Sequence, residues 1–313
     1  MALSVSIVIR ALNEENHLPK LFDGISKQTR PPEQIILVDS GSTDRSREIS
    51  SDAGASIVSI DPSDFTFGRA LNVGCEAATG EILVFVSAHV YPVDENWLEK
   101  LVAPFEENSD VALVYGRQTG DDRNHFSETE IMRRWFPDVS DSDQKHPFCN
   151  NANCAVRRSI WKQIPYDESL TGLEDMAWAK RALADGYRLW YESESTIVHV
   201  HEESIAQTMN RYRREGIAHK RIFGHQKMGV FEACTLFLAN TIRDYMAALP
   251  RRCLFSNLGS IPRFRYAQFR GAWLGLRQHE DPTSELKRRF YYPKGFTLRN
   301  NPTSSGLIEK SEL

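Results

Sequence analysis

Short apolar runs alternate with amphipathic stretches in the N-terminal part of the chain. The runs are Val5–Ile9, Gln34–Val38, Ala55–Ile60 and Ile82–Val86. Their apolar residues are largely consecutive and β-branched, which predicts strands buried on both faces, as in a parallel sheet covered by helices. Between them, the stripe from Leu18 to Ile25 and the stretch Arg69–Ala78 predict amphipathic helices. This order predicts an α/β fold with a mostly parallel, Rossmann-like, doubly wound sheet and helices on both faces.

The pattern changes after the fourth run. Strands are predicted at Val111–Tyr115 and Leu189–Tyr191, and a helix at Leu173–Ala184. From Gly116 to Lys145 the chain is polar and aperiodic apart from a helical piece near Glu128–Trp135, which predicts a functional segment such as a lid. The domains that we expect are a sheet domain at 1–204, with halves at 1–118 and 119–204, a mainly helical region at 205–299 and a disordered tail at 300–313.

Charge narrows the choice of partners. The 313 residues carry a formal net charge of −4, which gives no general reason to expect a nucleic-acid partner. The charge is nevertheless uneven, because ten Lys and Arg residues stand against three acids between Pro250 and Gly295. A local surplus of this kind attracts anionic surfaces such as phosphate groups or lipid headgroups.

Cysteine usage and the terminus indicate the compartment. The five cysteines form neither a paired framework nor a metal knuckle, so we expect reduced thiols in a cytoplasmic protein. The N-terminus lacks the basic region and cleavage site of a signal peptide. The longest apolar stretch near the C-terminus, Ala233–Ala239, is far shorter than the roughly 20 residues that span a bilayer. We expect a protein that does not cross a membrane.

Polar residues that are candidates for binding or catalysis follow the predicted strands. They are the cluster Arg10–Glu14, Asp39, the triplet Ser87–His89, the pair Glu174 and Asp175, and the histidines His199 and His201. Ligands of open α/β sheets bind beyond the carboxyl ends of the strands, so these residues are expected to meet there. An imidazole such as that of His89 binds a metal, carries a proton or simply caps its strand.

Six short motifs occur in a characteristic order between Val5 and Glu215. They are Asn-Glu-Glu, Val-Asp-Ser-Gly-Ser-Thr-Asp, Arg-x-x-Asn-x-Gly, Ala-x-Gly-Glu-Ile, Gly-x-Glu-Asp and His-x-His. In this order the chain resembles family 2 glycosyltransferases of GT-A fold, especially the bacterial branch that builds surface polysaccharides and includes rhamnosyltransferases. The resemblance implies an inverting transfer of a sugar from a UDP- or dTDP-linked donor to a hydroxyl group of a glycan or polyisoprenyl-linked acceptor. It makes residues 1–118 the nucleotide-binding half and 119–204 the acceptor half.

The resemblance also implies a donor site. Its residues would be Arg10, Ala11, Asn13, Glu14, Asp39, Arg69, Ser87 and Ala88. Asp39 would hydrogen-bond the base, although an acid after a strand also serves as a helix cap. Arg10 and Leu12 stand where the family usually has proline and tyrosine, so the usual stacking contact is not implied for this chain, and Arg10 would contact base, ribose or phosphate. Arg69 would face the nucleotide or lie on a solvated helix face.

The metal site is where the chain departs most from the family. The family's Asp-x-Asp is Ser87-Ala88-His89 here, so the resemblance implies a site for Mn²⁺ or Mg²⁺ made by His89 with His199 or His201. Two residues apart on a strand, these histidines would point to opposite faces, and His199 is favoured. Imidazole suits Mn²⁺ better than Mg²⁺. The alternative is that no metal binds tightly and that cationic side chains and helix N-termini hold the diphosphate.

The resemblance makes Asp175 the general base of an inverting reaction. The alternative for an acid here is favourable charge at a helix N-terminus. Residues expected to bind acceptor or sugar hydroxyls are Glu174, Arg117, Gln118, Asn151 and Asn153. Turn formation is the alternative for the asparagines.

Two other functions agree less well with the sequence. A nicotinamide-dependent oxidoreductase needs Gly-x-Gly-x-x-Gly after the first strand, and this chain has no glycine there. A catalytically inactive sugar-nucleotide-binding or scaffold protein is compatible with the missing Asp-x-Asp, but it gains little from a base at position 175.

A membrane contact is expected from the C-terminal region. Between Arg263 and Arg277, the apolar stripe Tyr266, Phe269, Trp273 and Leu276 runs beside arginines that recur every seven residues. This composition predicts a helix in a membrane interface, which would place the protein at the inner face of the cell membrane. The alternative is a helix packed on the catalytic domain with its arginines reaching solvent.

Overall fold

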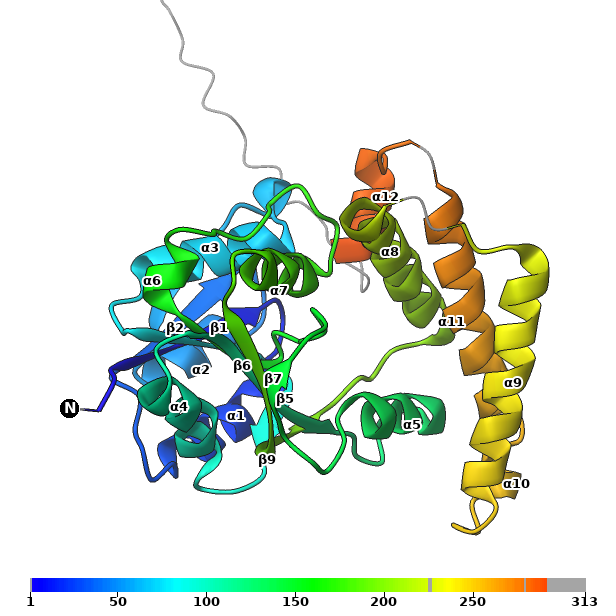
Figure 1. Ribbon diagram of the computed structural model, residues 1–313, viewed down its shortest axis with the longest axis horizontal. Helices are drawn as coiled ribbons and strands as arrows, with labels where there is room; N and C mark the ends of the chain where they lie inside the picture. The colour runs from blue at the N-terminus through cyan, green and yellow to red at the C-terminus, as the bar shows by residue number, and fades with distance from the viewer. Residues whose placement is uncertain (1, 225–226, 279, 292–313) are drawn as a thin grey trace, which may run out of the picture.

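The computed structural model describes residues 2–224, 227–278 and 280–291, so the tail predicted at 300–313 lies outside the described residues. At its centre is a nine-stranded sheet with the order β3-β2-β1-β4-β8-β6-β9-β5, and β7 pairs with β9 (Figure 1). The strands are β1 (Val5–Ala11), β2 (Gln34–Asp39), β3 (Ser56–Ser59), β4 (Ile82–Ser87), β5 (Val90–Pro92), β6 (Val111–Thr119), β7 (Asp141–Gln144), β8 (Asn153–Arg157) and β9 (Arg188–His199).

Helices cover the sheet and then form a separate layer at one side of it (Figure 1). Those that precede the end of the sheet are α1 (Leu18–Ser26), α2 (Ser46–Asp52), the 3-10 helix η1 (Pro62–Asp64), α3 (Phe67–Ala77), α4 (Trp97–Glu107), α5 (Phe126–Trp135), α6 (Arg158–Trp161) and α7 (Glu174–Ala184). After β9 come α8 (Ile205–Phe223), α9 (Val230–Ala248), α10 (Leu254–Asn257), α11 (Ser260–Arg277) and α12 (Ser284–Tyr291).

The α/β class predicted from the apolar runs is confirmed. Strands β3, β2, β1 and β4 are parallel neighbours, and β6 is parallel to β9. The sheet as a whole is mixed, since β8 runs antiparallel to both β4 and β6, and β5 and β7 run antiparallel to β9. The parallel prediction therefore holds for the N-terminal half and for the β6–β9 pair.

Burial on both faces explains why the first strands lack alternation. Ile7 and Val8 point to opposite faces of β1, and both are fully buried. Ile7 packs in a cluster with α1 and α4, whereas Val8 packs in a cluster with α3 and α7. Polar residues are consequently confined to the strand ends.

The segment 116–145, predicted to be largely irregular, is more ordered than its sequence suggests. It contains the end of β6, helix α5 and strand β7. The Tyr115 hydroxyl donates to Gln144 Oε1 at 2.6 Å, and the Gln144 amide donates to the Phe148 carbonyl at 2.7 Å. A buried glutamine thus holds the segment on the sheet, a contact that no local periodicity reveals.

Helix α11 packs on α8 rather than lying free. A Cβ on Gly275 would stand 2.3 Å from the Arg213 carbonyl, so glycine is required for the close approach of the two helices. Arg265, on the packed side, is 3% exposed and forms an ion pair with Asp244 of α9 at 2.7 Å. Of the stripe predicted to enter a membrane, Tyr266 is exposed and Trp273 is half-buried. Helix α11 is thus packed within the helical layer on one side, and its contact with a membrane stays a prediction.

Within the described residues, none of the helices combines the length and apolar character needed to cross a membrane.

Candidate functional site

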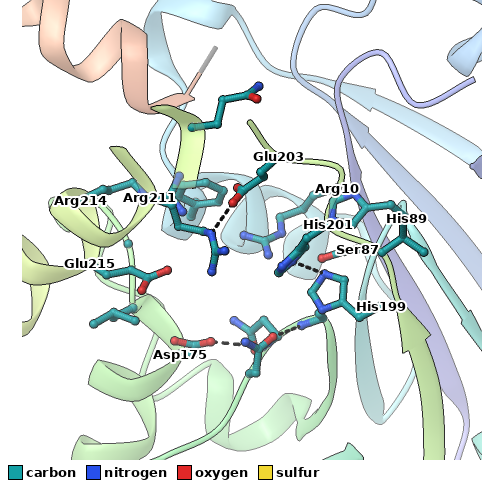
Figure 2. Close-up of a pocket in the computed structure, with 18 of the residues that line it drawn as sticks. Arg10, Ser87, His89, Asp175, His199, His201, Glu203, Arg211, Arg214 and Glu215 are labelled. Atoms are coloured by element: carbon teal, nitrogen blue, oxygen red, sulfur yellow. Dashed lines mark hydrogen bonds and ion pairs between the residues drawn. The ribbon is translucent and has the colours of Figure 1, made fainter. Parts of the chain in front are cut away.

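The carboxyl ends of β1, β4 and β9 open into a polar cavity of about 360 Å³, here called the polar cavity (Figure 2). Of the residues predicted from sequence it is lined by Arg10, Glu14, Ser87, His89, Asn151, Glu174, Asp175, His199 and His201. The strand ends bring these segments together although they are far apart in the chain. The central expectation, one site at this edge of the sheet, is what the geometry shows.

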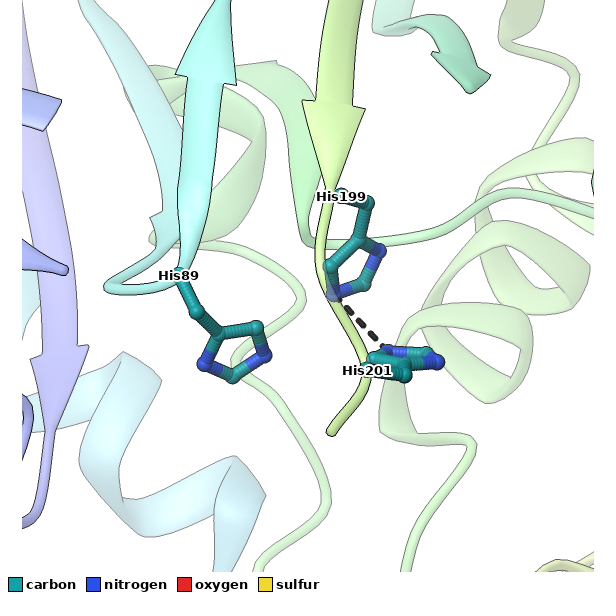
Figure 3. A group of neighbouring side chains, drawn as sticks. All are labelled: His89, His199 and His201. Atoms are coloured by element: carbon teal, nitrogen blue, oxygen red, sulfur yellow. Dashed lines mark hydrogen bonds between the residues drawn. The ribbon is translucent and has the colours of Figure 1, made fainter. Parts of the chain in front are cut away.

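Three histidines converge at the edge of the polar cavity (Figure 3). His89 follows β4, His199 ends β9, and His201 lies just beyond it. Their potential ligand nitrogens all lie within 4.8 Å of one another, and the Nε2 atoms of His199 and His201 are 2.9 Å apart.

Each histidine is oriented by an oxygen acceptor at its other nitrogen. The Nδ1 atoms of His89, His199 and His201 lie 3.0, 2.8 and 2.9 Å from Glu14 Oε1, Gln118 Oε1 and Glu128 Oε1, respectively. A ring that donates from Nδ1 keeps a lone pair on Nε2. The potential ligand nitrogens of three imidazoles therefore meet at one place, with an oxygen atom at the Nδ1 of each ring, which is the usual arrangement around a metal ion.

The surroundings of this histidine group shift the pKa values of His199 and Glu128. Burial, reinforced by His201 and His89, lowers the pKa of His199 well below its usual range, so the ring is neutral at neutral pH. Burial opposes ionisation of Glu128, but Arg211 and then His201 lower the pKa of its carboxyl to about 2. Arg211 Nη2 donates to both Glu128 oxygens, at 2.8 and 2.9 Å. Glu128 is therefore an ionised acceptor for His201.

The expectation that His199 and His201 point to opposite faces was wrong. Strand β9 ends at His199, and the Val200 N–H donates to the His89 carbonyl at 3.1 Å. Beyond that bond the chain leaves the strand, so the two-residue period no longer applies. The two rings lie with centroids 4.1 Å apart, and both reach the same point.

Asp175 lies in the first turn of α7 and is 9% exposed. Its Oδ1 accepts the Met176 N–H at 2.8 Å, and its Oδ2 accepts the Asn151 N–H at 3.2 Å. Burial, followed by the neighbouring Glu174 carboxylate, raises the pKa of Asp175 to about 7. A carboxyl group with this pKa exchanges protons near neutrality, which suits a general base. The preceding Leu173 has a φ of 55°, a strained conformation of the kind found at functional sites.

Arginines from two elements reach the polar cavity. Arg10, from β1, forms an ion pair with Glu174 at 3.2 Å. Arg211 and Arg214, from α8, were not predicted, and Figure 2 shows them across the cavity from the strand ends. Their three-residue spacing puts them on one helix face. The three-residue spacing could have suggested a shared face, but the sequence does not indicate which face of α8 lies toward the sheet. The spacing alone was therefore insufficient to predict that Arg211 and Arg214 reach the cavity.

A second cavity of about 510 Å³ adjoins the first and is called the aromatic cavity. Its walls include Trp135, Phe136 and Phe148, and the Trp135 and Phe148 rings stack with centroids 4.7 Å apart. Asp175, His199, His201 and Arg211 line both cavities. Asp175 thus stands where a polar compartment meets an aromatic one. Gln118 lines the aromatic cavity, where its Oε1 orients His199.

Several predicted donor residues have local structural contacts and do not line the polar cavity. Asp39 is buried, accepts the Ser42 N–H at 3.1 Å and pairs with Arg47 at 3.0 Å. Asn13 Oδ1 accepts the Thr43 N–H at 2.8 Å. Both side chains thus tie the first two strand-end loops together.

Ala11, Ala88 and Arg69 are also absent from the lining of the polar cavity. The two alanines are buried in the core. Arg69 is 44% exposed and pairs with Glu168 at 3.4 Å, as expected for a residue on a solvated helix face.

On the acceptor side, Asn151 and Asn153 differ sharply. The Asn151 amide is buried with neither its oxygen nor its nitrogen hydrogen-bonded, and the residue lines the polar cavity. Asn153 was wrongly assigned to the site. It accepts the Trp97 indole N–H at 2.9 Å and donates to the carbonyls of Arg117 and Ser195, which uses its whole amide inside the core. Arg117 pairs with Asp138 and lines neither cavity.

Comparison with known proteins agrees with this geometry. The model of the family described as Glycosyl transferase family 2 matches residues 6–164, just over half of the chain. The chain belongs to glycosyltransferase family 2. The match spans the strand ends that supply Arg10 and His89.

Curated relatives include O-antigen rhamnosyltransferases. O-antigen chain rhamnosyltransferase WbaN of Salmonella anatum is 31% identical over 209 residues, which cover 63% of this chain and 66% of that protein. O-antigen chain rhamnosyltransferase RfbN of Salmonella typhimurium is 26% identical over 229 residues, covering 69% and 73%. The chain thus spans about two thirds of the length of WbaN.

Solved structures of low sequence identity share the fold. Mannosyltransferase PcManGT from Pyrobaculum calidifontis, in complex with GDP-Man and Mn²⁺, has a TM-score of 0.61 and 16% identity, covering 94% of this chain and 89% of that one. TarS 1–349 from S. aureus, in complex with UDP-GlcNAc, has a TM-score of 0.55 and 14% identity, covering 85% and 90%. These similarities confirm the predicted GT-A fold.

Proposed function

We propose that this chain is an inverting glycosyltransferase. It transfers a hexose or rhamnose from a UDP- or dTDP-linked donor to a hydroxyl group of a glycan or lipid-linked acceptor in surface-polysaccharide synthesis. The observation that carries the proposal is the place of Asp175, a carboxyl group with a pKa near neutrality at the meeting point of the two cavities. Its two O-antigen rhamnosyltransferase relatives support the reaction class and favour rhamnose.

The donor is assigned to the polar cavity because three arginines and the three-histidine group line that cavity, together with six carboxyl groups. Arg10, Arg211 and Arg214 line it. Acidic neighbours fix two of them, since Glu174 pairs with Arg10 and Glu203 accepts from Arg211 at 2.9 Å. Guanidinium groups held in place stabilise the charge that develops on a departing diphosphate.

The acceptor is assigned to the aromatic cavity. Sugar rings stack on aromatic side chains, which Trp135 and Phe148 offer there. The unpaired Asn151 amide, in the wall of the polar cavity, is suited to a sugar hydroxyl group at the boundary.

The residues present fit a divalent cation. The potential ligand nitrogens of three histidines lie within 4.8 Å of one another, and the Nε2 atoms of His199 and His201 are 2.9 Å apart, a separation that two nitrogens bound to one cation can have. His89, His199 and His201 would hold it. When bound, the cation supplies Lewis-acid stabilisation of the leaving diphosphate. Three nitrogen ligands favour Mn²⁺ over Mg²⁺, which prefers oxygen.

In the transfer step, the Asp175 carboxylate takes the proton of the acceptor hydroxyl group as that oxygen bonds to C1 of the sugar. The bond from C1 to the donor phosphate oxygen breaks, and its electron pair leaves with the nucleoside diphosphate. Attack opposite the leaving group inverts C1. A single carboxylate is sufficient because the diphosphate leaves without being protonated.

The test is release of UDP or TDP from a panel of nucleotide sugars, measured with and without glycan acceptors. Release that depends on an acceptor, with a product of inverted anomeric configuration, supports the proposal. Retained configuration refutes the inverting mechanism. Nucleotide binding without turnover for every pair tested supports an inactive sugar-nucleotide-binding protein instead.

A further inference from the structure

The outer face of α9 is apolar although none of the described residues covers it. Its large apolar residues recur at helical spacing and are between 57% and 86% exposed. They are Phe231, Leu238, Ile242, Met246 and, just after the helix, Leu249. Helix α10 follows with Phe255 and Leu258, which are 87% and 46% exposed. Figure 1 shows α9 as the outermost helix, on the far side of α11 from the sheet. These seven residues are called the ridge.

The exposed apolar side chains of the molecule are concentrated at the ridge and not scattered over its surface. Of the twelve large apolar residues exposed in the described part of the chain, nine lie between Val230 and Tyr266, on α9, α10 and α11 or just beyond the ends of α9 and α10. The helices are firmly placed, since the buried pair of Arg265 and Asp244 joins α11 to α9. The Tyr245 hydroxyl donates to the Leu258 carbonyl at 2.7 Å and holds α10 beside α9. A fixed apolar surface of this kind marks an interaction site.

Charge indicates what covers the ridge. Between residues 229 and 278 the chain has seven arginines, no lysine and two acids, one of which is the buried Asp244. Arg243, Arg252, Arg263 and Arg270 are exposed. An apolar surface bordered by cations is complementary to a bilayer with anionic headgroups.

An arginine-lined cleft of about 800 Å³ lies beside the ridge, between α5, α9 and α11. Its cations are Arg133, Arg134, Arg243, Arg251 and Arg265. Glu130 pairs with Arg133 and Arg251, and Asp244 pairs with Arg265. Within the described ranges, Arg134 and Arg243 have no ion-pair partner.

The cleft joins the ridge to the site. The cleft is lined on the α9 side by Leu236, Ala239 and Arg243. These residues lie on a face of α9 next to the one that carries the ridge. Ile131, Trp135 and Gln268 line both the cleft and the aromatic cavity. A phosphate group in the cleft thus lies between the surface that the ridge defines and the cavity that reaches Asp175.

We propose that the ridge rests on a lipid bilayer and that the arginine cleft binds the phosphate group of a lipid at that surface. Arginine is suited to this role because its guanidinium group binds phosphate oxygens in pairs. The contact delivers a lipid-linked acceptor to the aromatic cavity, and only this last step rests on the proposed function. The surface differs from the one predicted from sequence, since it belongs to α9 and α10 rather than to the stripe of α11.

Vesicle flotation tests the proposal without requiring turnover. The full chain is mixed at low salt with phosphatidylcholine vesicles with or without phosphatidylglycerol. We expect flotation with the anionic vesicles that weakens on adding salt. Ile242→Ser combined with Phe255→Ser should lower partitioning at least tenfold, because both side chains lose apolar contact with lipid. Arg134→Gln combined with Arg243→Gln should lower it about 10- to 30-fold on anionic vesicles alone.

Val139→Ser is the matched control, because Val139 is 75% exposed and lies outside the ridge. It should float as the wild type does. The proposal is refuted if the wild type floats with neither vesicle, or if the ridge variant floats equally well. It is also refuted if sedimentation shows a dimer that the ridge substitutions dissociate, since the ridge then covers a second copy.

Two further results distinguish the membrane contact, the lipid-phosphate site and the proposed function from one another. Tight binding of inorganic phosphate that is lost in the arginine variant, with flotation unchanged, would assign the cleft to a soluble anion and overturn its lipid role. Flotation as expected without sugar transfer in any assay would refute the proposed function and leave the membrane contact standing.

Discussion

Replacing Asp175 by asparagine tests the centre of the mechanism. The substitution keeps the shape of the side chain and removes its basicity, so turnover is expected to fall by roughly 10²–10⁴. Donor affinity should be nearly unchanged, because the cationic groups assigned to the donor are those of Arg10, Arg211 and Arg214. In the wild type, kcat should rise with pH through about 7 as the carboxyl group ionises.

The same substitution has a signature in stability. Because the pKa of Asp175 is higher in the folded protein than its ordinary value of 3.8, the folded state binds the extra proton. The wild type is therefore most stable relative to the variant at low pH, and it loses that advantage as pH rises toward about 7. At about 1.4 kcal/mol per pH unit, and with the carboxyl group half ionised at about pH 7, the change between pH 5 and pH 7 is about 2 kcal/mol.

The stability of the wild type relative to the variant should fall steadily across that window. Asparagine places an N–H group against one of the two backbone N–H groups that donate to the Asp175 carboxylate, and this cost of about 1–2 kcal/mol does not titrate. The variant should thus gain stability relative to the wild type from pH 5 to pH 8. Urea unfolding at several pH values measures this directly.

Glu174→Gln is the informative control. Removing the neighbouring carboxylate, and freeing Arg10, should move the rise in kcat to lower pH without abolishing turnover. Near-normal turnover of Asp175→Asn, together with parallel stability profiles, would refute both the base assignment and the burial argument.

Three further predictions concern the metal, the helical layer and the asparagines. EDTA or His201→Ala should abolish Mn²⁺-dependent donor binding in calorimetry, and binding that survives chelation contradicts the three-histidine site. Arg265→Met should lower the free energy of unfolding by about 3–5 kcal/mol in urea, and adding Asp244→Leu should restore most of it; an equally unstable double variant would contradict the ion-pair explanation. Asn151→Ala should raise the acceptor KM about 3- to 10-fold with little change in stability, whereas Asn153→Ala should lower unfolding free energy by about 2–4 kcal/mol; the reverse pattern would be evidence against both roles.

Local pattern was sufficient for the buried strands of the N-terminal half and for the residues at their ends, but not for β5 and β7. Consecutive β-branched residues have no solvated face, so the runs around Ile7 and Val84 fold as buried strands in any compact arrangement. Polar residues must then collect where the strands end, which predicts Arg10 and His89 in one cavity. Asp175 was assigned as the general base because the motif around it resembles that of the family. The burial that raises its pKa could not be predicted from the sequence.

Tertiary structure alone decided which polar groups remain available for ligands. Asn151 and Asn153 are two positions apart, yet packing against Trp97 uses one amide fully and leaves the other without a partner. The end of β9 at His199 lets His201 turn back, which strand periodicity excluded.

The helical layer shows the same division. Arg211 reaches the site because α8 presents that face to the sheet, and the register of α8 depends on its glycine-dependent packing against α11. The apolar stripe in α11 and the one in α9 are similar as sequences. The close approach of Gly275 to α8 and the pairing of Arg265 with Asp244 turn one face of α11 inward, whereas Ile242 of α9 faces outward. A side chain's neighbours across the fold are set by the packing of distant segments, and periodicity within one segment contains no information about them.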